Sequence, residues 1–178
     1  MNITLICAGR IKEKYIKDAI DEYMKRLGKY CNLKIIEVED EKAPEKLSLL
    51  DEGIIKKKES ERIKRYIKEG TYVIGLDILG EMQSSEEFSG FVEKLALNGK
   101  SDVTFIIGGS IGLSLDILDN ADYKLSFSKM TFPHQLMRVI LLEQIYRGFR
   151  IIKGEPYHKG SYGWKDKKNE VSFKINKK

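Results

Sequence analysis

The chain has 178 residues, of which 42% are hydrophobic and 33% are charged, and its formal net charge is +5. This length and composition are typical of one folded domain, and no apolar run approaches the roughly 18 residues of a membrane-spanning helix. A membrane protein is therefore excluded, and because no basic leader precedes the first short apolar run, we expect a cytoplasmic protein.

The first third of the chain predicts alternating strands and helices. Residues 2–8 indicate a buried strand, and the next segment places apolar side chains on one helical face that ends near Gly28. Residues 33–38 indicate a second strand. Pro44 then opens a highly charged stretch to Glu69, whose Lys-Glu-Ser-Glu-Arg centre predicts an exposed helix.

The alternation continues with a third strand over residues 71–78, closed by Leu79-Gly80. Ser84 and Glu87 form a capping box for a helix that runs to about Leu97. An ordinary loop explains residues 81–85 as well as a segment folded over a pocket does. The remaining predicted elements are a strand, a short helix, a strand and a long helix, over residues 102–107, 113–121, 123–127 and 133 to about 153.

This order of elements predicts an α/β fold with a mostly parallel sheet flanked by helices, and ligands at the carboxyl ends of the strands. The turn over residues 108–112, Gly-Gly-Ser-Ile-Gly, would let backbone approach a ligand closely. A tight turn without a ligand explains it equally well. Ala8-Gly9-Arg10 supplies only one glycine, so a dinucleotide cofactor is not expected.

Metal chemistry has no support in the sequence. Cys7 and Cys31 are isolated thiols without a second pair or a nearby histidine, so neither a disulfide framework nor a zinc motif is indicated. We expect no metal, and we expect Cys7 to be a buried structural thiol.

The most distinctive run is Ser-Phe-Ser-Lys-Met-Thr-Phe-Pro-His-Gln at residues 126–135. It follows Ile-Ile-Gly-Gly-Ser at residues 106–110 and precedes Gly-Glu-Pro-Tyr-His-Lys at residues 154–159. Together these motifs resemble the ribosomal RNA large subunit methyltransferase H family, which belongs to the SPOUT class of knotted methyltransferases. The resemblance covers residues 1–159.

That resemblance implies a single SPOUT domain over residues 1–159 with a C-terminal trefoil knot, which periodicity alone would not predict because knots are so rare. Residues 160–178 would be a basic C-terminal extension. Members of the family use S-adenosylmethionine, work as homodimers, and methylate N3 of a pseudouridine in 23S ribosomal RNA. The resemblance also implies that the assembled ribosome, rather than free RNA, is the substrate, and a compact core over residues 1–159 accords with recognition of a large preformed surface.

The resemblance also assigns the cofactor contacts, mostly through backbone groups and apolar packing around the adenine. The residues are Leu76, Gly108, Phe127, Ser128, Lys129, Met130, Thr131 and Phe132. Ile111 departs from the family pattern, in which we expect a polar residue, and its apolar side chain would alter the rim of the pocket.

Two residues near the end of the chain are candidates for the target side of the reaction. N3 of pseudouridine carries a proton that must leave, so a base or a strong acceptor would help. His158 is our preferred residue, placed to reach a neighbouring subunit's cofactor, and Tyr157 could stack on an extracted base. An exposed terminal histidine is the competing interpretation. For His134, a packing role at the helix start is favoured.

Positive charge is concentrated where these motifs lie. Residues 1–122 carry a net charge of −4 and residues 123–178 a net charge of +9. Such an excess suits a polyanionic partner. The candidate phosphate-binding residues are Arg138, Arg147, Arg150, Lys153 and Lys159, although a solvated helix face explains each of them equally well. In the extension, aromatic residues lie among lysines, a composition that suits RNA.

Two functions are consistent with these observations. One is the methyltransferase, with one subunit binding the cofactor and the other's C-terminal residues assisting the RNA. The other is a non-catalytic RNA- or ribosome-binding module that retains an adenosine pocket. Binding of S-adenosylmethionine alone would not separate them, because only the enzyme consumes it in the presence of RNA.

Overall fold

A computed structural model describes residues 1–44 and 46–156 of the chain. It contains five strands: Asn2–Ala8 (β1), Asn32–Val38 (β2), Tyr72–Met82 (β3), Asp102–Ile107 (β4) and Tyr123–Ser126 (β5). Five helices alternate with them: Lys14–Leu27 (α1), Leu49–Lys64 (α2), Ser85–Leu97 (α3), Leu115–Asp119 (α4) and His134–Ile152 (α5). The predicted elements are all present.

The strands form one sheet in the order β2-β1-β4-β3-β5, and every neighbouring pair is parallel. This confirms the predicted α/β fold with its parallel sheet. Parallel strands place all their carboxyl ends at one edge, where α/β proteins bind ligands. The C-terminal trefoil knot stays a prediction from the family resemblance.

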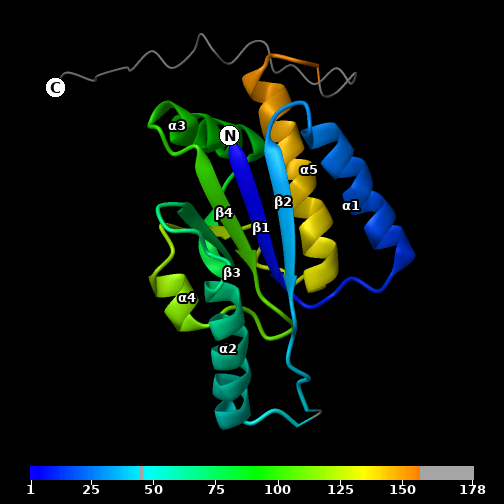
Figure 1. Ribbon diagram of the computed structural model, residues 1–178, viewed down its shortest axis with the longest axis vertical. Coiled ribbons are helices and arrows are strands. Elements are labelled where there is room, and N and C mark those ends of the chain that lie inside the picture. Colours follow the sequence, from blue (N-terminus) through cyan, green and yellow to red (C-terminus); the bar gives the residue numbers. More distant parts are fainter. Residues whose placement is uncertain (45, 157–178) are drawn as a thin grey trace, which may run out of the picture.

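Helices cover both faces of the sheet (Figure 1). One core lies between the sheet and α1, α3 and α5, and includes Leu5 and Phe105 of the central strands. The other lies under α2 and α4 and includes Ile6 and Ile106. Neighbouring residues of one strand therefore serve opposite cores, as the two-residue period of a strand requires. Cys7 is fully buried, as predicted.

The third strand is longer than predicted. It continues through Leu79 and Gly80 to Met82, so its last two residues pair with β5 and do not form a loop. The register shifts between Leu76 and Glu81, which leaves the intervening residues as a bulge. A Cβ atom at Gly80 would lie 2.7 Å from the backbone of Lys124, so the strands approach closely there only because the residue is glycine.

Helix α2 also differs from the prediction. It begins after Ser48, whose side chain accepts the Asp51 N–H in a capping box. The centre of the helix was predicted to be exposed, yet Glu59 and Ser60 are buried. Glu59 is covered because it packs against the segment after β2 and the turn after β4, contacts that local charge patterning does not report.

Candidate functional site

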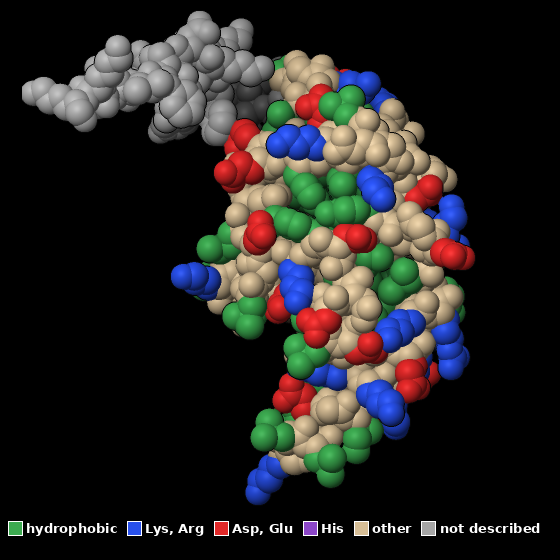
Figure 2. Space-filling model, turned by 90° about the vertical axis from the view of Figure 1, so that its left-hand side faces the viewer, with side chains coloured by type: hydrophobic (Ala, Val, Ile, Leu, Met, Phe, Trp, Pro, Cys, Tyr) green, Lys and Arg blue, Asp and Glu red, His purple; other side chains and the backbone are tan. Residues whose placement is uncertain are grey.

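A cavity of about 180 Å³ lies at the carboxyl ends of β3, β4 and β5. Three segments form most of its wall: the β3 bulge, the turn over residues 108–112, and the connection between β5 and α5. It shares lining residues with a larger hollow of about 790 Å³ that extends to α2 and α4. The space-filling view shows a concave outline between the body of the molecule and its lower end, where α2 lies (Figure 2).

The turn after β4 is closed by its own backbone. The Gly112 N–H donates to the Gly109 carbonyl at 3.1 Å, and Gly112 has a φ of +81°, which favours glycine. A Cβ atom at Gly108 would lie 2.5 Å from the carbonyl carbon of Gly112. The turn therefore presents bare backbone to the cavity. Ile111 lines the larger hollow and not the smaller cavity.

The connection between β5 and α5 is fixed against the β3 bulge. The hydroxyl of Ser126 lies 3.2 Å from the carbonyl oxygens of both Ile78 and Ser128, and it can donate to either. The Met130 N–H in turn donates to the Ser128 hydroxyl at 2.9 Å. These bonds shape the connection from within, and they join two of the three segments that form the cavity wall.

The structure brings the predicted cofactor residues to one place. Seven of the eight line the small cavity: Leu76, Gly108, Phe127, Ser128, Met130, Thr131 and Phe132. Lys129 is exposed and does not line it. The sequence analysis did not single out several further lining residues, including Asp77, Ile78 and Met137. Their only sequence signal was their closeness to the predicted residues.

His134 also lines the cavity, from the start of α5. Burial lowers the pKa of its imidazole, and the nearby Arg138 guanidinium lowers it further, against the opposing effect of Asp40 and Glu13. The histidine therefore favours its neutral form. This placement accords with the predicted packing role at the helix start. In addition, His134 forms part of the cavity wall.

Arg138 does not face solvent, so its prediction as a phosphate contact is wrong. Its side chain is fully buried and forms an ion pair with Glu37 at 2.7 Å. It also donates to the carbonyl oxygens of Ala8 and Gly9, each at 2.8 Å. These contacts join α5 to the ends of β1 and β2. Arginine is seldom buried without such partners, which lie far away in the sequence.

The other candidate phosphate-binding residues lie toward the end of α5. Arg147 pairs with Glu143 at 2.7 Å, and Arg150 pairs with Glu155 at 2.7 Å and donates to the Tyr146 hydroxyl at 2.8 Å. Lys153 caps the helix and is exposed. The remaining predictions, Tyr157, His158, Lys159 and the 160–178 extension, lie outside the described residues.

Within residues 1–44 and 46–156, no helix is both long and apolar enough to cross a membrane. In the same part of the chain, no group of three or more His, Cys, Asp or Glu side chains is placed to hold a metal ion.

Comparison with known proteins identifies relatives of the chain. Residues 1–158 match the family model described as "Predicted SPOUT methyltransferase". A protein of Clostridium kluyveri named "Ribosomal RNA large subunit methyltransferase H" is 63% identical over 159 residues, which is 89% of this chain and all of the relative. A protein of the same name from Clostridium acetobutylicum is 62% identical over the same shares.

A solved structure has the same fold at low sequence identity. It is described as a "Probable Methyltransferase" from Bordetella pertussis, with a TM-score of 0.52, 10% identity, and coverage of 83% of this chain and 95% of that one. At this identity the likeness concerns the fold alone. The family match and the two close relatives show that this chain belongs to the SPOUT methyltransferase family, in the ribosomal RNA large subunit methyltransferase H group.

Proposed function

We propose that this protein transfers a methyl group from S-adenosylmethionine to N3 of a pseudouridine in 23S ribosomal RNA, as a homodimer acting on the assembled ribosome. The single observation that carries the proposal is the convergence on one cavity of three segments that lie far apart in the sequence, each with at least one residue that the family resemblance assigns to the cofactor. Membership of the methyltransferase H group supports ribosomal RNA as the substrate.

The cavity suits an adenosine-containing cofactor. Its wall combines apolar side chains, such as Leu76, Phe127 and Phe132, with backbone from the glycine turn and the β5–α5 connection. Ligand pockets usually span roughly 300–1,000 Å³, so a cofactor in the 180 Å³ cavity would extend into the adjoining hollow. Bound there, S-adenosylmethionine would supply an activated methyl group. The residues of this chain would orient it and exclude water.

The rim of the cavity supports a dimer. Met130 is 73% exposed and Phe132 is 40% exposed, so apolar side chains that line the cavity also reach solvent at its opening. Cover by a second subunit would bury them. In this arrangement the partner's C-terminal residues, Tyr157 and His158, would meet the target base, and His158 would accept the proton of N3.

A labelling experiment tests this function. The purified protein would be incubated with methyl-labelled S-adenosylmethionine and ribosomes that lack the modification, with protein-free 23S ribosomal RNA in parallel. We expect label at N3 of a pseudouridine, in the ribosome only, and a large loss of turnover without loss of cofactor affinity in His158→Ala. No label in a protein that still binds the cofactor would refute the enzyme and favour a non-catalytic module.

A further inference from the structure

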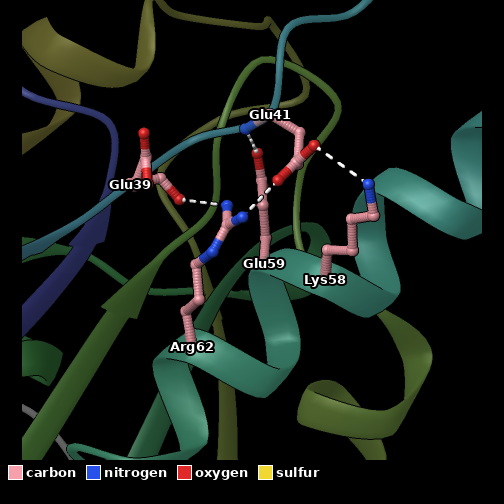
Figure 3. Close-up of polar contacts among 5 residues, drawn as sticks. All are labelled: Glu39, Glu41, Lys58, Glu59 and Arg62. Atoms are coloured by element: carbon pink, nitrogen blue, oxygen red, sulfur yellow. Dashed lines mark hydrogen bonds and ion pairs between the residues drawn. The ribbon is translucent and has the colours of Figure 1, made fainter.

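The buried carboxylate of Glu59 lies between two segments that follow different strands. It projects from α2, and the residue is only 3% exposed. Its Oε1 accepts the backbone N–H of Glu41 at 3.0 Å (Figure 3). Glu41 belongs to the segment after β2, so Glu59 holds that segment against α2.

On its other side Glu59 touches the glycine turn. A Cβ atom at Gly109 would lie 3.0 Å from both carboxylate oxygens, closer than a side chain normally tolerates. The Gly109 amide is one of the groups that lower the pKa of this carboxyl and so favour its charged form. The glycine and the carboxylate are therefore close without a hydrogen bond to Oε2. This buried oxygen has no hydrogen-bond partner within the described part of the chain.

Charged side chains of α2 also hold the segment after β2, to which Glu41 belongs. Arg62 donates to the Glu39 carbonyl at 2.9 Å and to the Glu41 carboxylate, which Lys58 also approaches at 3.4 Å (Figure 3). Burial raises the pKa of Glu59 and Asp40 raises it further, whereas the amides of Glu41 and Gly109 and the Arg62 guanidinium oppose the rise. Burial therefore disfavours the charged form of this carboxylate, and the two amides and the guanidinium only partly offset that cost.

We propose that Glu59 is a positioning residue for the cofactor cavity, which it shapes by holding the backbone of the 108–112 turn. Gly108, Ser110 and Gly112 of this turn line the cavity, whereas Glu59 does not. The carboxylate acts through Gly109 on the cavity wall and contacts no ligand itself. The ligand's identity rests on the function proposed above, but the positioning role rests on the contacts of Glu59 alone.

Replacement of the carboxylate by an amide tests the role at nearly constant volume. Glutamine has one acceptor oxygen where glutamate has two. In Glu59→Gln the side-chain NH2 group therefore lies against the backbone N–H of either Glu41 or Gly109, and neither group can accept a hydrogen bond. We expect S-adenosylhomocysteine to bind roughly tenfold more weakly, about 1.4 kcal/mol, because a buried N–H donor set against another donor carries a cost of this order and the turn would shift to avoid it. Amide hydrogen exchange within residues 109–112 should quicken in the ligand-free protein. Glu61→Gln, on the exposed face of the same helix, is the matched control.

The two measurements separate this proposal from the proposed function. If wild type does not bind S-adenosylhomocysteine but exchange quickens only in Glu59→Gln, the positioning role stands and the ligand is wrong. If wild type binds and Glu59→Gln matches it in both affinity and exchange, the positioning role is refuted. Equal changes in Glu61→Gln would also refute it, because a general effect of charge would then explain them.

A double-mutant cycle tests the contact itself. Gly109→Ala should weaken binding because its Cβ atom displaces the carboxylate. In a Glu59→Ala background the same change meets no carboxylate, so the loss in the double variant should be close to that of Glu59→Ala alone. Losses that add would show that the two residues act independently, and would overturn the proposal.

Discussion

Two buried charged groups lie at the carboxyl edge of the sheet, and their surroundings differ. Arg138 meets a carboxylate and two backbone carbonyl oxygens through its two terminal nitrogens, whereas its buried Nε has no partner among the described residues. Glu59 accepts one well-formed hydrogen bond and keeps a second oxygen without a partner among the described residues. Each group thus keeps one buried atom without a partner, but three contacts hold Arg138 to the ends of β1 and β2, whereas one hydrogen bond holds Glu59 beside the candidate site.

The difference predicts which property each group controls, the stability of the domain or the shape of the cavity. Arg138 joins α5 to the ends of β1 and β2, so its loss should destabilise the whole domain. Glu59 restrains one turn and one segment, so its loss should change the cavity more than global stability. Buried polar groups left partly unsatisfied are often tolerated where function requires them.

The largest effect is expected from Arg138→Met. The substitution leaves the carbonyl oxygens of Ala8 and Gly9 buried without their donor and Glu37 without its partner. We expect the free energy of unfolding to fall by about 3 kcal/mol, measured by urea denaturation. Arg147→Met, on the same helix in a partly exposed pair, should cost less than about 1 kcal/mol. Equal losses would remove the distinction between the two environments.

Gly108→Ala should change the cavity more than the stability of the domain, as expected for Glu59. Its Cβ atom would meet the Gly112 backbone at 2.5 Å, so the turn must shift. We expect cofactor affinity to fall at least tenfold, about 1.4 kcal/mol, by isothermal titration. Gly90→Ala in α3, where a Cβ atom has free space, should bind normally. Normal binding by both variants would separate the turn from the cofactor site.

The pH dependence of stability should reveal Glu59. Because its pKa is raised in the folded protein above the ordinary 4.5, the folded state holds the proton at pH values where the unfolded state has lost it. The contribution of Glu59 to stability should therefore decrease as the pH rises from about 4.5 through that raised pKa, whereas carboxyls with a lowered pKa, such as those of Glu41 and Asp51, act in the opposite direction. When both proteins are denatured across this range, the stability of wild type relative to Glu59→Gln should decrease as the pH rises. Parallel curves would contradict the raised pKa.

The smallest effect on stability is expected from Lys153→Glu. Its side chain is exposed at the end of the helix that buries Arg138, so unfolding should change by less than about 0.5 kcal/mol. If Lys153 contacts a phosphate, the salt dependence of ribosome binding should become shallower by about one unit of slope. An unchanged slope would leave Lys153 as an ordinary solvated residue.

The sequence by itself determined the elements with strong local signals. The apolar runs of β1 and β4 gave those strands their predicted bounds, and Ser84 with Glu87 marked the start of α3. The motif at residues 126–135 indicated the family, and most of its predicted cofactor residues line one cavity. These features depend on neighbours within a few residues, whose periodicity and hydrogen bonding local patterns report.

Only the tertiary structure decided the strand order, the continuation of β3 through Gly80, and the burial of Arg138 and Glu59. Charged residues on a helix are normally exposed, so local patterning assigned both side chains to solvent. Arg138 is buried against Glu37 and the end of β1. These partners lie about 100 or more residues away in the sequence, so local patterns do not report them. Burial of a charge depends on such distant partners, and the free energy that stabilises it arises only when the chain has folded.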